Sequence, residues 1–196
     1  MQLTKISSLN HSYLMKIKCF PFLAVLLFAS VNAWAQPQKG SVMIGGNAGF
    51  TSTKYPGFIE DFTVTTITVA PMAAFFVSDQ FAVGGSINLT ILGGDADGSS
   101  IAASPLARYY FNNSGSSRFF GQANVSFGSI DPGEGADSQS FFGYGVLAGV
   151  DFFLNSNVAI EAGLGFNSLK AKDDNDPTNT FALVVGVAAF IGGGSE

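Results

Sequence analysis

The chain has 196 residues, and nine Lys and Arg against fourteen Asp and Glu give it a formal net charge of −5. An acidic chain lacks the basic surface that phosphate contacts need, so we exclude nucleic-acid binding. Charged residues make up 12% of the chain, against about 25% in ordinary soluble domains, while 47% of the residues are hydrophobic. This composition favours a membrane environment.

The N-terminal residues have the order of an export signal. A basic stretch at 15–18 is followed by an apolar run at 20–29 and then by Ala33-Trp34-Ala35, a small-x-small site before Gln36. This order predicts a secretory signal peptide over residues 1–35, cleaved between Ala35 and Gln36. The alternative interpretation, a membrane anchor, is disfavoured because the apolar run is too short to span a bilayer as a helix.

Cleavage would change the inventory of reactive side chains. The single Cys, His and Trp all lie in the signal segment, at Cys19, His11 and Trp34. Loss of three of the nine basic residues leaves six against fourteen acids, a net charge of 6 − 14 = −8. The exported chain is therefore predicted to have no disulfide, no thiol nucleophile and no imidazole. Residues 1–14 resemble a surplus extension, which makes Met15 a candidate start beside Met1.

Eight segments after the signal peptide alternate between apolar and polar residues with a period of two. The clearest sets Val83, Ile87, Leu89 and Ile91 against Ser86, Asn88 and Thr90. Each segment has about ten residues or more, as a tilted membrane strand requires. Backbone groups in lipid must be paired internally, so such strands must close into a barrel. We predict an all-β fold, an eight-stranded antiparallel up-and-down transmembrane β-barrel over 36–191, followed by a short periplasmic tail at 192–196.

The connections between the segments alternate in length. The short turns are expected at 78–80, 112–117 and 155–156, and the longer acidic loops at 54–61, 93–99, 130–137 and 171–178. This alternation is typical of a barrel with periplasmic turns and extracellular loops. Pro71 and Pro105 fall inside two segments, and since proline cannot donate to a ladder, we expect a bulge or a local bend at each.

Aromatic residues of the apolar face cluster near the segment ends. Two rings of aromatics are what the two membrane interfaces favour. The predicted lipid-interface aromatics are Phe50, Phe75, Phe81, Tyr109, Phe111, Phe119, Phe127, Phe142, Phe152, Phe166 and Phe181.

Three stretches carry a resemblance to a known family. They are Ser104-Pro105-Leu106-Ala107-Arg108-Tyr109-Tyr110-Phe111, Ala73-Ala74-Phe75-Phe76-Val77 with the following Phe81-Ala82-Val83-Gly84-Gly85, and Gly149-Val150-Asp151-Phe152-Phe153 with Asn157-Val158-Ala159-Ile160-Glu161. They resemble the small outer-membrane β-barrel domain family of Bacteroidetes-type bacteria, whose wider group includes outer membrane protein X-like proteins and the transmembrane domain of outer membrane protein A.

The resemblance covers residues 36–191 and implies an eight-stranded barrel in the outer membrane of a Gram-negative cell envelope. It implies outer-membrane lipid, lipopolysaccharide and the barrel-assembly machinery as partners. Members serve as adhesins, scaffolds or narrow pores, so the resemblance does not imply one activity. Chains of this kind usually end on an aromatic residue, whereas here Phe190 has interior parity and Ile191 and the tail follow it.

The alternation places four charged residues on the inward face of the barrel: Arg108, Arg118, Asp151 and Glu161. All four lie in the periplasmic half of four neighbouring strands. The interior of an eight-stranded barrel is just filled by side chains, and buried charges there must be paired. We therefore predict an internal ion-pair network that forms a structural plug, with a rearranging gate as the alternative.

We expect no catalytic residues. Asp151 and Glu161 could form a paired-carboxylate catalyst, but the nearby Arg residues should keep both carboxylates ionised, and a plugged interior leaves no substrate cavity. The acidic stretches 94–98 and 173–176 do not complete a calcium loop, so no metal and no cofactor are predicted.

The sequence favours a non-enzymatic outer-membrane β-barrel of structural or surface-interaction type with a charge-plugged interior. One alternative is a narrow pore or a transporter for small solutes or apolar molecules. A second is a soluble exported barrel that binds a ligand.

Overall fold

The computed structural model of the chain describes residues 37–55, 62–112, 114–133, 137–172 and 175–192. The expected signal peptide, with the cleavage-site residues Ala33, Ala35 and Gln36, lies outside the described residues, as does the tail beyond Gly192. No helix within the described ranges is long and apolar enough to cross a membrane.

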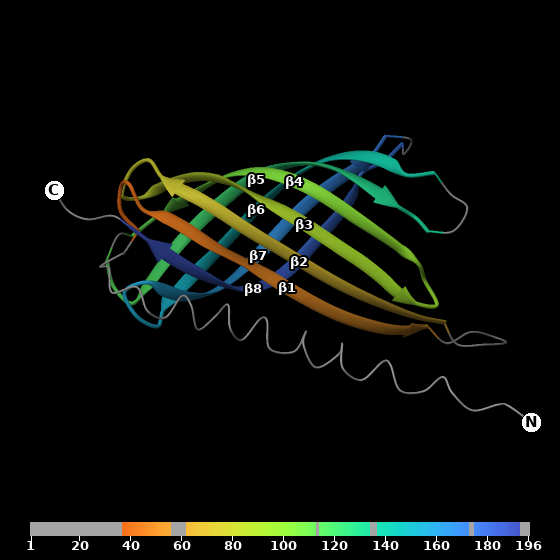
Figure 1. Cartoon of the computed structure of the whole chain (residues 1–196), viewed down its shortest axis with the longest axis horizontal. Helices are drawn as coiled ribbons and strands as arrows, with labels where there is room; N and C mark the ends of the chain where they lie inside the picture. Colours follow the sequence, from red (N-terminus) through yellow and green to blue (C-terminus); the bar gives the residue numbers. More distant parts are fainter. Residues whose placement is uncertain (1–36, 56–61, 113, 134–136, 173–174, 193–196) are drawn as a thin grey trace, which may run out of the picture. The chain divides into compact units, whose positions relative to one another are not determined.

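Eight antiparallel strands of 13 to 15 residues form one closed barrel in chain order (Figure 1). This confirms the predicted all-β, eight-stranded up-and-down barrel. At about 3.3 Å per residue and a tilt of about 40°, fourteen residues rise by about 35 Å, enough for a hydrocarbon core of about 30 Å. The strands are β1 (Val42–Tyr55), β2 (Phe62–Phe76), β3 (Phe81–Gly94), β4 (Gly98–Tyr110), β5 (Ser117–Asp131), β6 (Gln139–Phe153), β7 (Val158–Ala171) and β8 (Thr178–Ile191).

The barrel has two distinct ends. We call one the turn end, formed by connections 77–80, 111–116 and 154–157, and the other the loop end, formed by 56–61, 95–97, 132–138 and 172–177. The expectation of a long loop at 93–99 is wrong, because β3 and β4 leave only three residues between them. Asp95 makes two hydrogen bonds to the Thr63 backbone there: its side-chain Oδ2 accepts from the Thr63 N–H, and its backbone N–H donates to the Thr63 carbonyl, both at 2.8 Å.

In each strand, the alternating apolar residues lie on the outer face of the barrel. Ten of the eleven aromatics predicted to face lipid are exposed large hydrophobics, and the eleventh, Phe166, is half-buried because it packs on Phe181 with ring centroids 4.9 Å apart. Neighbouring outer aromatics also pair at Phe127 and Phe142, with centroids 5.3 Å apart. The alternation along each strand therefore places these rings outside the barrel.

The two strand prolines interrupt ladders without changing register. β2 lacks ladder pairs with β3 at Ala70 and Pro71, and β4 lacks them with β5 at Ser104 and Pro105, yet the residue partners on either side keep the same register. A bulge would add a residue to one strand and shift that register, so of the two expected alternatives, a bulge or a local bend, the bulge is excluded at both sites.

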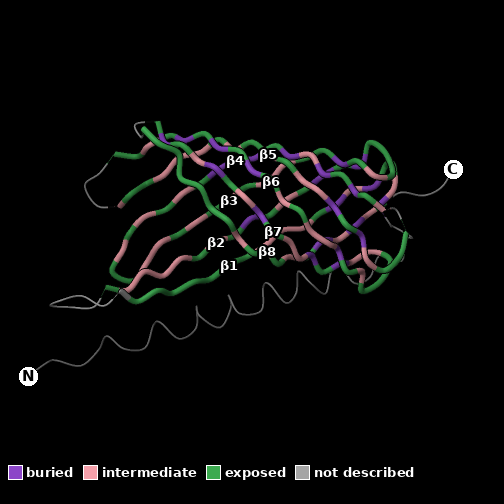
Figure 2. Tube along the Cα trace, turned by 180° about the vertical axis from the view of Figure 1, so that it is seen from behind, coloured by how far each residue is buried: buried purple, intermediate pink, exposed green. Residues whose placement is uncertain are grey.

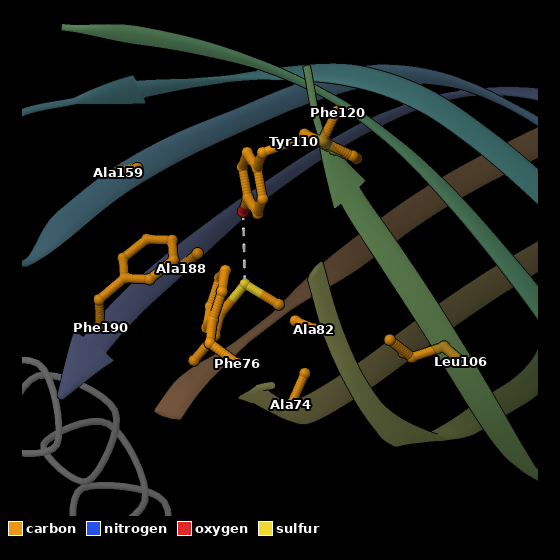
Figure 3. Packing of buried hydrophobic residues seen from close by; sticks show 10 residues of the cluster. Ala74, Phe76, Ala82, Leu106, Tyr110, Phe120, Ala159, Ala188 and Phe190 are labelled. Atoms are coloured by element: carbon orange, nitrogen blue, oxygen red, sulfur yellow. Dashed lines mark hydrogen bonds between the residues drawn. The ribbon is translucent and has the colours of Figure 1, made fainter. Parts of the chain in front are cut away.

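The buried interior is concentrated in the half nearer the turn end, as the buried stretches of Figure 2 show. Five inward rings form what we call the aromatic layer: Phe76, Tyr110, Phe120, Phe153 and Phe190. Figure 3 shows Phe76, Tyr110 and Phe190 turned toward one another inside the barrel. A smaller apolar group, Ala102, Phe141 and Ala171, lies near the loop end.

The seam that closes the barrel is shorter than every other strand pairing. β1 pairs with β8 from Val42 to Asn47, opposite Ile191 to Gly186, which is six residue pairs. Each of the other seven pairings has at least ten. The two strands separate toward the loop end (Figure 1).

Candidate functional site: a buried charge cluster

The four charged residues of interior parity lie on four consecutive strands. Arg108 is on β4, Arg118 on β5, Asp151 on β6 and Glu161 on β7, and each is at most 5% exposed. In the strand register Arg118 lies opposite Asp151, and Asp151 lies opposite Glu161. The fold therefore places two cations and two anions at one level of the interior.

Arg108 is the centre of the cluster. Its Nη1 donates to Oε2 of Glu161 at 2.5 Å and lies 3.9 Å from Oδ2 of Asp151. Its Nε and Nη2 both donate to Oε1 of Gln122, at 2.9 and 2.7 Å. The guanidinium also lies 3.9 Å from the centroid of the Phe120 ring, within cation–π range. The structure thus brings three of the four charged residues into direct contact.

Tyr110 connects this cluster to the aromatic layer. Its hydroxyl donates to Oδ2 of Asp151 at 2.6 Å. It also lies 3.6 Å from the Met43 sulfur, the contact that Figure 3 marks with a dashed line from the Tyr110 oxygen. Sequence reasoning did not single out Tyr110 or Gln122. The alternation does predict that Tyr110 faces inward, because its neighbour Tyr109 faces outward. It does not predict which residue across the barrel Tyr110 contacts.

Arg118 contacts the segment that precedes β1. Its Nη1 donates to the carbonyl of Pro37 at 3.3 Å, and its guanidinium lies 5.3 Å from the centroid of the Phe153 ring. Its side chain is 1% exposed, so it lies inside the turn end. The structure therefore places Arg118 opposite Asp151 of the cluster and in contact with the segment before β1.

An interior cavity of about 290 Å³ lies on the loop-end side of the cluster. Arg108, Gln122 and Glu161 form its floor. Amide and hydroxyl side chains line its wall, among them Asn47, Thr68, Ser86, Asn88, Asn124 and Asn167. Within the described ranges, no group of three or more His, Cys, Asp or Glu side chains could hold a metal ion. The cavity above the cluster therefore has a mixed lining, with amide and hydroxyl groups beside apolar side chains such as Met72, Leu147 and Val184.

Comparison with known proteins agrees with this architecture. The family model described as the outer membrane protein beta-barrel domain matches residues 22–188. The crystal structure of Neisserial surface protein A is 18% identical with a TM-score of 0.52, covering 77% of this chain and 97% of that one. The N-terminal β-barrel domain of Pseudomonas aeruginosa OprF is 15% identical with a TM-score of 0.52, covering 78% and 98%. At these identities the likeness shows the fold alone. No curated protein sequence matches the chain.

Proposed function

Since the chain belongs to the outer membrane protein beta-barrel domain family, we propose that it is an integral protein of the bacterial outer membrane with a structural or surface-interaction role. Its interior is sealed against passage from one side of the membrane to the other. The observation that carries this proposal is the buried cluster of Arg108, Asp151 and Glu161 resting on the aromatic layer.

A seal at this position has a physical basis. The interior of an eight-stranded barrel is just wide enough for its own side chains. Arg108 is fully buried and engages Glu161, Gln122 and the Phe120 ring together, so moving it aside would separate a desolvated ion pair. The aromatic layer fills the remaining width toward the turn end. Ions therefore have no open route through this half.

The outer face supports the proposed surroundings. Exposed aromatics near both ends of the strands suit the two membrane interfaces, which makes outer-membrane lipid the first partner. Lipopolysaccharide is the proposed partner at the loop end, and the barrel-assembly machinery is the proposed partner during insertion. A catalytic role is not proposed, because the two buried carboxylates are held by Arg108 and Tyr110.

Single-channel recording tests the seal. The chain from Gln36 onward would be refolded and inserted into a planar lipid bilayer, with insertion verified by heat-modifiable gel mobility. We expect a silent bilayer, because the cluster and the aromatic layer leave no ion path. Discrete conductance steps that disappear on heat denaturation would favour the narrow-pore alternative instead. Release of the exported protein with the periplasmic fraction would favour the soluble ligand-binding barrel.

A further inference from the structure

The seam between β1 and β8 forks in the middle of the barrel wall. Pairing stops at Asn47 opposite Gly186. Continuing the same register would pair residues 48–53 with 185–180, but these described residues make no ladder pairs with one another. We call this unpaired stretch, residues 48–53 of β1 and 180–185 of β8, the seam gap.

The interior cavity extends to the fork. Its lining includes Asn47, the last paired residue of β1, and Val184, which lies two residues beyond the last pair on β8. The inward-facing residues Gly49, Thr51 and Thr180 are exposed, although they belong to the barrel interior by parity. By contrast, the apolar group of Ala102, Phe141 and Ala171, on β4, β6 and β7, is buried. The cavity is therefore open on the side of the seam.

The seam gap is apolar on its outer side and polar on its inner side. Phe181 is 82% exposed, Leu183 75% and Phe50 68%, and these side chains form an apolar outer rim. By strand parity Thr51 and Thr180 provide hydroxyls on the inner side, and Asn47 provides an amide at the fork. Unpaired strand edges also present backbone N–H and C=O groups, which are costly in lipid unless another molecule engages them.

We propose that the seam gap is a lateral doorway between the cavity and the surrounding lipid. It would take small amphipathic molecules with a hydrocarbon tail and one uncharged hydrogen-bonding group. The tail matches the outer rim, and the polar group matches the amide and hydroxyl lining of a cavity whose charged floor residues already pair with each other. A cavity of about 290 Å³ is at the lower end of the range of about 300–1,000 Å³ for small-molecule sites.

The doorway is compatible with the sealed turn end of the proposed function and adds a second activity to it. The charge cluster closes the path toward the turn end, so a molecule that enters the cavity leaves sideways through the seam gap. Ion conductance stays absent whether the doorway operates or not, so the two proposals can fail separately.

A blocking substitution tests the doorway. Gly49 faces inward at the gap, and an added Cβ would meet only the Thr68 Cβ at 4.0 Å, so Gly49→Trp can place a bulky ring there. Gly93→Trp is the matched control, because Gly93 lies near the loop end of β3 and an added Cβ would meet nothing within 4 Å. The readout is the initial rate at which the neutral amine N-phenyl-1-naphthylamine fluoresces in the lipid of intact cells that carry the chain.

We expect cells with the unaltered chain to take up the probe faster than cells without it. Gly49→Trp should remove all of this added uptake, and Gly93→Trp should retain it. Heat-modifiable mobility would verify that both variants form barrels. Uptake by the unaltered chain equal to that of cells without it, or uptake by a folded Gly49→Trp barrel equal to the unaltered rate, would overturn the proposal.

Cysteine pairs test whether the seam is open in a bilayer, in a chain that carries Cys19→Ser. Phe50→Cys with Leu183→Cys spans the gap, and Ile44→Cys with Ala189→Cys spans the paired part of the same seam on the same face. Directly paired strand residues place their Cβ atoms about 4.5–5.5 Å apart, close enough for a disulfide after slight adjustment. We expect mild oxidation to bridge the control pair and leave the gap pair reduced. Equal bridging within one chain, or bridging between two chains, would overturn the doorway.

Discussion

Arg108 and Glu161 are 53 residues apart in the chain, yet Nη1 of one donates to Oε2 of the other at 2.5 Å inside the barrel. Their strands, β4 and β7, are not neighbours in the sheet, so this contact crosses the interior. It joins two opposite parts of the wall that the ladder hydrogen bonds connect only around the circumference.

Arg108→Ala should destabilise the barrel strongly. Removing the guanidinium leaves Glu161 and Asp151 buried without their shared cation, and breaking a buried pair in this way costs about 3–5 kcal/mol. The measurement is the free energy of unfolding in urea, in lipid vesicles. Lys170→Ala, at an exposed position on β7, is the control and should change stability by less than about 0.5 kcal/mol. An Arg108→Ala barrel as stable as the parent would contradict the assigned role of the cluster.

A double-mutant cycle should reveal the coupling between Arg108 and Glu161. Arg108→Met and Glu161→Leu each leave a buried charge behind, whereas the double variant removes both charges of the close pair. We expect the double variant to lose less stability than the sum of the singles, with a coupling of about 0.5–3 kcal/mol. Strict additivity of the three unfolding free energies would mean that the two side chains do not stabilise each other.

Tyr110→Phe should cost more than the same change one residue earlier. The Tyr110 hydroxyl donates to Oδ2 of Asp151 at 2.6 Å, and Oδ1 of Asp151 accepts no hydrogen bond among the described residues. Loss of this donor leaves a buried carboxylate less satisfied, at a cost of about 1–3 kcal/mol. Tyr109→Phe is the matched control, since Tyr109 faces outward on the same strand. Similar unfolding free energies for the two variants would count against the Tyr110–Asp151 bond.

Phe190→Ala should destabilise the turn end, although Phe190 lies near the end of the chain. Its ring is buried and packs against Phe153 and Phe76, with centroids 5.2 and 6.1 Å away. Truncating a buried Phe to Ala costs about 3–5 kcal/mol. Phe181→Ala, on the outer face of the same strand, should cost clearly less. The midpoint temperature of heat-modifiable gel mobility compares the two, and an equal effect would contradict the interior position of Phe190.

Local alternation was sufficient to predict the strands and the outward aromatics, because residue parity depends only on the strand itself. It also placed Arg108, Arg118, Asp151 and Glu161 on the inner face. It could not predict that Gln122 accepts two hydrogen bonds from Arg108, or that Tyr110 bonds Asp151, because such contacts depend on side-chain conformation inside the closed barrel.

Two other features could not be predicted from the local alternation of residues. The turn at 95–97 is tight because Asp95 bonds to Thr63, a residue 32 positions away that no local signal relates to it. The fork at Asn47 and Gly186 joins the first and last strands, whose pairing depends on closure of the whole barrel rather than on either sequence alone.

The carbonyl of Pro37 accepts a hydrogen bond from Arg118 inside the turn end, five residues before β1 begins. Gly40 then donates its N–H to the Phe76 carbonyl, which ties the same segment to the end of β2. The segment that precedes β1 thus helps to close this end of the barrel. Cleavage after Ala35 would retain this segment, whereas removal of the chain through Pro37 would take away the carbonyl that accepts from Arg118.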